Sequence, residues 1–100
     1  MIDGTYKFDV NTPLGRKTVL VTLRGQGSTA IINVDAPIVG KKQTTGDLDG
    51  DTFFVQGSLK VPMIGKVTFA AKGTVVGDEL RVAVDSNKGQ FNPVGIRVKR

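Results

Sequence analysis

The chain has 100 residues and a formal net charge of +5, and it contains neither cysteine nor histidine. A single domain spanning 1–100 is expected at this length. The two absent residue types exclude disulfides, the common zinc sites and nucleophiles activated by histidine, so any chemistry depends on carboxylates, Lys, Arg, the one Tyr or the backbone.

The start of the chain, MIDGTYKFDV, has no apolar run preceded by positive charge, and nowhere do about 18 apolar residues follow one another. We therefore expect a cytoplasmic protein without stable membrane insertion. The positive charge suits an anionic partner and is also ordinary for a soluble protein. No aromatic run of the kind that stacks on bases is present, so nucleic acid is not an expected partner.

Apolar residues alternate with polar ones in seven runs along the chain, and no long stretch keeps a helical period. This pattern predicts an all-β fold in which each strand buries one face. The apolar members of the runs are Tyr6, Phe8 and Val10; Val19, Val21 and Leu23; Ala30, Ile32 and Val34; Phe53 and Val55; Val67, Phe69 and Ala71; Leu80, Val82 and Val84; and Val94, Ile96 and Val98.

Two-residue hairpin turns are predicted at three places, and each turn fixes which residues lie opposite one another. For the first and the third of these turns the apolar sets of the two strands then share a face, and the second puts Lys42, Thr44, Gly46 and Leu48 on the buried side. The turns, each with one pair that it predicts, are Gln26–Gly27 with Leu23 opposite Ala30, Asp49–Gly50 with Gly46 opposite Phe53, and Gly77–Asp78 with Val75 opposite Leu80.

The stretch DLDGDTFF, residues 47–54, has aspartates at alternate positions, as a calcium loop does. An EF-hand loop also needs glycine at its sixth position and glutamate at its twelfth. Counted from Asp47, these positions hold Thr52 and Ser58. We therefore interpret the stretch as a hairpin turn and predict no metal site. The phase of this hairpin turns Lys42 and Phe53 inward and Phe54 outward.

The other connections share a different pattern, in which a proline is followed by apolar residues, a glycine and a basic residue. The glycines of Pro13–Gly15, Pro37–Gly40 and Pro62–Gly65 stand at positions 15, 40 and 65, and a divergent fourth connection, Ser86–Gly89, follows. This spacing indicates a repeated hairpin unit. It predicts an eight-stranded antiparallel up-and-down meander that closes into a small barrel, because closure removes exposed strand edges.

Gly4-Thr5-Tyr6 resembles the Gly-x-Trp element in the first strand of lipocalins, with Tyr6 where lipocalins have Trp, and Arg97 is placed like the arginine that packs across that tryptophan. With the Thr12–Gly15 turn and the Asp-Gly hairpins, the whole chain resembles small bacterial lipocalin-like, or calycin-like, β-barrel proteins. The resemblance implies that the Gly-x-Trp end is closed and that ligands enter at the opposite end, past the Pro-Gly connections.

At that open end the sequence places basic residues beside apolar ones, whereas acidic residues gather at the closed end. Such a mouth suits a ligand with an apolar body and an anionic end. The expected ligand-binding residues are Lys42, Thr44, Tyr6, Phe53, Phe69, Gln90 and Asn92. The expected mouth residues are Leu14, Ile38, Met63, Ile64, Lys41 and Lys66.

We therefore predict a module that binds a small apolar or amphipathic molecule, anionic or not, without a cofactor, in preference to an enzyme. One alternative is a cofactor-free isomerase, cyclase or lyase that uses Lys42 or Tyr6. Another is a structural homo-oligomerisation or interaction module with a filled barrel. Its partner would contact the outer wall at Phe54 and Gln56, because an exposed Phe on a barrel wall is typical of an interface.

Overall fold

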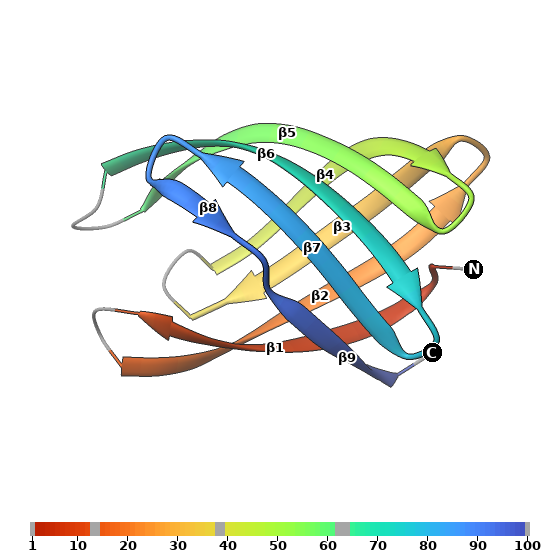
Figure 1. The fold of residues 1–100 in the computed structure, drawn as a ribbon, viewed down its shortest axis with the longest axis horizontal. Coiled ribbons are helices and arrows are strands. Elements are labelled where there is room, and N and C mark those ends of the chain that lie inside the picture. Colours follow the sequence, from red (N-terminus) through yellow and green to blue (C-terminus); the bar gives the residue numbers. More distant parts are fainter. Residues whose placement is uncertain (1, 13–14, 38–39, 62–64, 100) are drawn as a thin grey trace.

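The computed structural model describes residues 2–12, 15–37, 40–61 and 65–99. These residues form strands that follow one another around a ring (Figure 1). Within these ranges no helix has the length and apolar character that a membrane span requires. The strands are β1 (Gly4–Thr12), β2 (Gly15–Gln26), β3 (Thr29–Ala36), β4 (Gly40–Asp49), β5 (Thr52–Val61), β6 (Gly65–Val76), β7 (Glu79–Ser86), β8 (Gly89–Phe91) and β9 (Val94–Lys99).

Each strand from β1 to β7 pairs antiparallel with the next one along the chain, and the ring closes because β9 pairs with both β7 and β1. β8 pairs with Val84–Ser86 and β9 with Glu79–Arg81. These two short strands are therefore pieces of one eighth strand, interrupted at Asn92 and Pro93, where proline has no N–H to contribute to a ladder. The predicted eight-stranded antiparallel barrel with up-and-down order is confirmed.

The two ends of the barrel are distinguished by their connections. We call the end with the turns Gly27–Ser28, Gly50–Asp51 and Gly77–Asp78 the base. The opposite end, where β1 ends and β2 begins, is the mouth. In Figure 1 the base is on the right and the mouth on the left.

Two of the three hairpin turns lie one residue later than predicted, while the Gly77–Asp78 turn and its pair of Val75 with Leu80 are confirmed. The predicted pairs at the other two turns are wrong. The structure places Leu23 opposite Ile32 instead of Ala30, and Phe53 opposite Leu48 instead of Gly46.

Glycine explains this shift, because it occupies the first loop position in all three turns. Gly27, Gly50 and Gly77 have φ angles of 63°, 63° and 62°, a left-handed conformation that favours glycine. The two incorrect predictions put glycine at the second loop position. Since the correction moves each register by two residues, the same side chains still face inward. Phe53 is 3% exposed and Phe54 45% exposed, as their predicted phases require.

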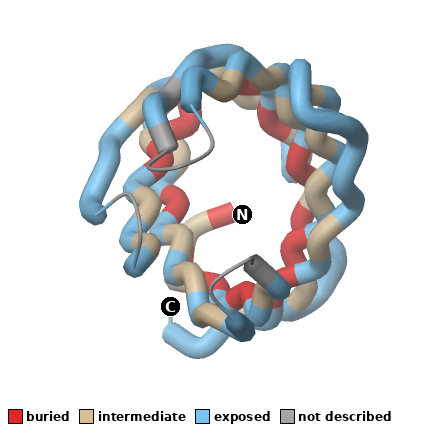
Figure 2. Tube along the Cα trace, turned by 90° about the vertical axis from the view of Figure 1, so that its left-hand side faces the viewer, coloured by how far each residue is buried: buried red, intermediate tan, exposed pale blue. Residues whose placement is uncertain are grey.

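The base is filled by apolar side chains and covered by the N-terminal segment. Ile2, Tyr6, Leu23 and Leu80 are almost completely buried. The Tyr6 hydroxyl donates a hydrogen bond of 2.9 Å to the carbonyl oxygen of Ile2, and the start of the chain lies inside the ring in Figure 2. Full burial of a side chain of this size stabilises a fold by roughly 1.5–3 kcal/mol, so the base dominates stability.

Arg97 joins the last strand to the first at the base. Its guanidinium lies 5.2 Å from the centre of the Tyr6 ring, and its Nη2 and Nε donate hydrogen bonds of 2.6 and 3.1 Å to the Tyr6 hydroxyl. Its Nη1 lies 3.3 Å from an Asp78 carboxylate oxygen. The arginine–aromatic contact that the lipocalin resemblance implied is therefore present.

The last strand presents the opposite face to the interior from the one predicted. Val94, Ile96 and Val98 are 51%, 50% and 56% exposed, so the prediction that they form an inner apolar set is wrong. Gly95 is buried instead, and a Cβ there would lie 2.6 Å from the Phe8 ring. Because the Phe8 and Tyr6 rings already occupy the interior beside β9, only glycine and the extended Arg97 side chain fit inside it.

Candidate functional site: the mouth of the barrel

The inner face of the barrel changes character between base and mouth. Most of the buried apolar residues that form the core lie toward the base. Farther toward the mouth, side chains of the same inner face pack against this core but remain partly exposed. Solvent therefore reaches apolar surface inside the mouth, which Figure 2 views end-on. These partly buried residues include Val10, Val19, Val21, Val34, Phe69, Ala71 and Val82.

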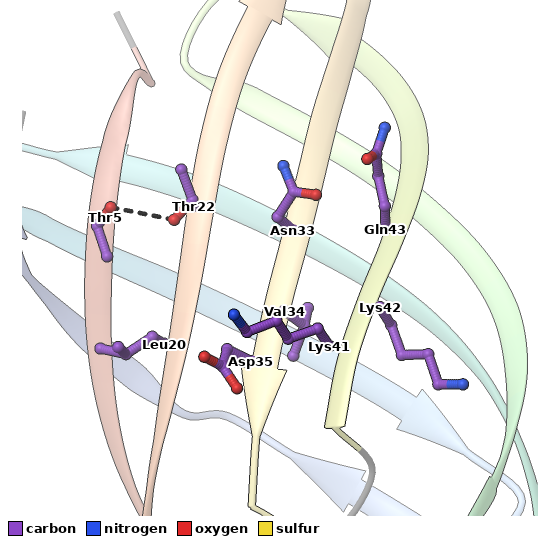
Figure 3. Close-up of a pocket in the computed structure, with 9 residues that line it drawn as sticks. All are labelled: Thr5, Leu20, Thr22, Asn33, Val34, Asp35, Lys41, Lys42 and Gln43. Carbon is purple, nitrogen blue, oxygen red and sulfur yellow. Dashed lines mark hydrogen bonds between the residues drawn. The ribbon is translucent and has the colours of Figure 1, made fainter.

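Lys42 lies on this inner face, because it stands opposite Val34 in the β3–β4 ladder. Figure 3 shows it leaving β4 in the opposite direction from Lys41. The residue is exposed at the rim, and no carboxylate of the described residues forms an ion pair with it. Thr44 follows on the same face, opposite Ile32, and is half-buried. At the mouth end of β4, the inner face thus carries the Lys42 ammonium, followed toward the base by the Thr44 hydroxyl, beside the apolar side chains of Val34 and Ile32.

Lys17 is a second inward-facing lysine, and the predicted set of site residues did not include it. It lies opposite Val10 at the mouth end of β2 and is half-buried. The signal was present in the sequence, because Lys17 continues the period-two series of Val19, Val21 and Leu23. Two ammonium groups therefore belong to the inner face of the mouth.

Two aromatic side chains complete the apolar part of this region. Phe69 is half-buried, and its ring lies so close to Gly57 that a Cβ there would be 3.3 Å from Cζ. Phe91 lies opposite Val84, which assigns it to the inner face, and it is 52% exposed. Phe91 was also missed, because the predicted phase of this part of the chain put Gln90 inward instead.

The structure separates the seven predicted ligand-binding residues into three groups. Lys42, Thr44 and Phe69 share the inner face above the base. Tyr6 and Phe53 are buried in the base, at 0% and 3% exposure, away from the mouth.

The third group, Gln90 and Asn92, does not face inward as predicted. Gln90 lies opposite Asp85, whose other neighbour across the ladder is the exposed Ala70, so it belongs to the outer face. Asn92 lines a hollow on the outer wall with Pro93 and other residues. The cause is the same for both residues: Phe91, not its neighbours, is in phase with the inner face of β7.

The predicted mouth residues are only partly described. Lys41 and Lys66 are exposed and belong to the outer face, opposite Asp35 and Lys60 respectively. They lie at the mouth but do not line its interior. The predictions for Leu14, Ile38, Met63 and Ile64 fall outside the described residues.

The outer wall carries its own features. Phe54 and Gln56 are exposed on it, in the predicted phase, and the Lys72 ammonium lies 5.7 Å from the centre of the Phe54 ring. A shallow hollow of about 450 Å³ crosses β1 to β4, where Thr5 and Thr22 share a hydrogen bond of 3.0 Å (Figure 3). Among the described residues, no three carboxylates gather closely enough to hold a metal ion.

Comparison of the chain with protein-family models, with curated proteins and with solved structures found no match. The barrel architecture is compatible with a lipocalin-like fold. The geometry of the mouth is therefore the basis for any functional assignment.

Proposed function

We propose that the barrel binds a small molecule with an apolar body and an anionic end at its mouth. One observation carries this proposal: the apolar side chains that face the interior above the base are only partly buried, whereas most of those in the base are buried. Exposed apolar surface inside a barrel is stabilised when an apolar ligand covers it.

The charge of the ligand follows from the two inward-facing lysines. Lys17 and Lys42 are on the inner face of the mouth, and no carboxylate of the described residues forms an ion pair with either one. An anionic group bound beside them would keep its contact with rim water while the apolar body enters the barrel.

The packed base limits the length of the ligand. On β2 the inner face from Val21 to Lys17 spans five residues, which is about 13 Å along the strand and about 10 Å along the axis of a barrel with a strand tilt of about 40°. This depth suits a chain of roughly eight carbons or a compact ring system. A long-chain lipid would extend far beyond the mouth.

The resemblance to lipocalin-like proteins supports this orientation. The Arg97–Tyr6 contact marks the base as the closed end, and the mouth lies opposite. The alternative of a cofactor-free enzyme has less support, because the Tyr6 hydroxyl is buried between Ile2 and Arg97, which leaves Lys42 without a partner for acid–base chemistry.

Calorimetric titration with octanoate tests the proposal, with octylamine as the matched cation. We expect one saturable site for octanoate. Replacing Lys17 or Lys42 by Met should weaken binding about two- to fivefold for each lysine, the range for exposed charge pairs. Lys66→Met is the control, since Lys66 is exposed at the mouth but faces outward. Failure of octanoate to saturate, or equal binding of octylamine, would contradict the proposal.

A further inference from the structure

β4 and β5 are paired at the base and separate toward the mouth. Their ladder consists of three pairs, Asp47 with Phe54, Leu48 with Phe53 and Asp49 with Thr52. On their other edges both strands are paired along their length, β4 with β3 as far as Gly40 and β5 with β6 as far as Val61. Figure 1 shows the two strands diverging. We call the space between residues 40–46 and 55–61 the fork.

The backbone groups that point into the fork can be identified from the alternation of an antiparallel ladder, in which successive residues direct their N–H and C=O groups to opposite neighbours. Leu48 donates its N–H to the carbonyl of Ser28, on the β3 side, with a distance of 2.8 Å. Asp47 and every second residue before it therefore point toward β5. Within the fork these residues are Lys41, Gln43 and Thr45.

The same reasoning applies to the opposite edge. The carbonyl of Asp51 accepts a hydrogen bond of 2.9 Å from Val75, so Asp51 points toward β6. Thr52 and every second residue after it point toward β4, which in the fork selects Gln56, Ser58 and Lys60. The register of the three existing pairs would join these residues to those of β4, but among the described residues the ladder stops at Asp47 and Phe54. Both edges thus offer unpaired strand backbone.

A hollow of about 430 Å³ lies where the fork begins. It is lined by inner-face residues Gly46 and Val55 and by outer-face residues that include Phe54 and Gln56. The Phe54 carbonyl lies directly against Gly46, where any side chain would block it. Gly46 therefore allows β5 to cross close to β4 at this point before the strands separate, and the hollow leaves Phe54 accessible, at 45% exposure.

Within its bounds the fork carries only positive charge, and Asp47 lies at its base end, where it lines the hollow. Residues 40–46 and 55–61 contain Lys41, Lys42 and Lys60 and no aspartate or glutamate. Lysines on a strand edge oppose pairing with a strand of like charge, and a second copy of this chain would bring its own three lysines to the same place. A strand that carries carboxylates would have the complementary charge.

We propose that the fork binds an extended, acidic segment of another polypeptide by strand addition. Residues that pair with Lys41, Gln43 and Thr45 point their side chains to the outer face, as those three do, so acidic residues are expected at alternate positions of the segment. The residues between them face the interior and should be apolar. A segment of about seven residues matches the length of the fork.

The test is a titration of the isotopically labelled protein with the peptide acetyl-Glu-Val-Glu-Val-Glu-Val-Glu-amide, followed by nuclear magnetic resonance. We expect saturable binding. The amide protons of all six residues that point into the fork should exchange at least tenfold more slowly. These residues are Lys41, Gln43, Thr45, Gln56, Ser58 and Lys60. The amide protons of Lys42 and Thr44, which already face β3, should change little in exchange rate. The matched peptide with Lys in place of Glu should bind at least tenfold more weakly.

Two kinds of variant separate the backbone and charge contributions. Gln43→Pro removes one N–H that points into the fork without removing a β3–β4 hydrogen bond, and it should lower affinity at least tenfold. The double change Lys41→Glu with Lys60→Glu keeps every backbone group and should also lower affinity at least tenfold. Lys7→Glu, on the outer face of β1, is the control and should bind as the parent does.

Three results would overturn the proposal. One is the absence of saturable binding, and another is equal binding of the acidic and basic peptides. The third is slow exchange of the same six amides in the free protein together with a concentration-dependent dimer, because a second copy of the chain would then occupy the fork.

Discussion

The base and the mouth of the barrel are formed by the same strands, but their inner faces are filled differently. At the base, Tyr6, Leu23 and Leu80 are buried, and Arg97 lies across the Tyr6 ring. At the mouth, Phe69 is half-buried, and Lys42 reaches the rim from the inner face. The packed core thus lies at the base, and the proposed ligand site lies at the mouth of the same barrel. A substitution at one end should change one property, stability or ligand binding, with little effect on the other.

The largest expected effect comes from adding a methyl group to an inner-face glycine. A Cβ at Gly95 would lie 2.6 Å from two carbons of the buried Phe8 ring, so the ring must move within a packed core. We expect Gly95→Ala to lower the free energy of unfolding by about 1–3 kcal/mol. At the mouth, Gly57→Ala would place its Cβ 3.3 Å from the Phe69 ring, which is a milder contact with a ring that is only half-buried.

Urea denaturation of the two glycine variants measures this difference directly. Gly57→Ala should cost less than about 1 kcal/mol or even stabilise the fold, because alanine reduces the freedom of the unfolded chain. Equal losses for the two variants would mean that the mouth is packed as tightly as the base, and the proposed ligand site would then have no room.

A second comparison concerns the arginine at the base and one on the surface. Arg97 has a side chain that is 7% exposed, stacks on Tyr6 and pairs with Asp78. Arg81 pairs with Glu79 at 3.0 Å, but its side chain is 61% exposed. We expect Arg97→Met to cost about 1–2 kcal/mol in unfolding free energy, because a stacking contact and buried hydrogen bonds are lost. Arg81→Met should cost less than about 0.5 kcal/mol.

Thermal and urea denaturation of both arginine variants provide the measurement. Arg97 is also expected to hold β9 against β1, so the amide protons of β9 should exchange faster in Arg97→Met than in Arg81→Met. If both variants lost the same small amount of stability, the contact with Tyr6 would be a surface interaction and not part of the closure of the barrel.

Much of the fold could be predicted because each strand has one apolar phase and each hairpin turn contains glycine. The predicted phases of Phe53 and Phe54 are correct, although the Asp49–Gly50 turn was placed one residue early. The alternation of apolar and polar residues determines which face of a strand a residue belongs to. This assignment does not change when the register between two strands is wrong by two residues. The exact partner depends on which loop position needs a positive φ.

The alternation of apolar residues could not show which face of the last strand points into the barrel. Val94, Ile96 and Val98 have the same pattern as an inner apolar set, but the space inside β9 is filled by Phe8 from β1. Which side chains fill this space depends on contacts between the two ends of the chain. Tyr6 and Arg97, for example, are in contact although they are about 90 positions apart. The incorrect inward prediction for Gln90 concerns the same part of the chain. Lys17 is a different case, because its inward orientation could have been predicted from the period-two series that it forms with Val19 and Val21.

The smallest expected effect tests this reversed last strand. Ile96 is 50% exposed on the outer face, and Ile32 is 5% exposed on the inner face. Threonine keeps the β-branched shape and the strand propensity of isoleucine but introduces a hydroxyl. Ile96→Thr should change the unfolding free energy by less than about 0.5 kcal/mol. Ile32→Thr should cost more, about 1–2 kcal/mol, because a buried hydroxyl must be desolvated and an apolar contact is lost.

Urea denaturation of the two threonine variants distinguishes the observed face of β9 from the predicted one. If Ile96→Thr destabilised the protein as much as Ile32→Thr, Ile96 would be buried, either inside the barrel or in an interface between copies. Repeating the measurement over a hundredfold range of protein concentration separates these two cases, because only the interface depends on concentration. The structure predicts a small and concentration-independent effect, since Gly95 and Arg97 already occupy the inner face of this strand.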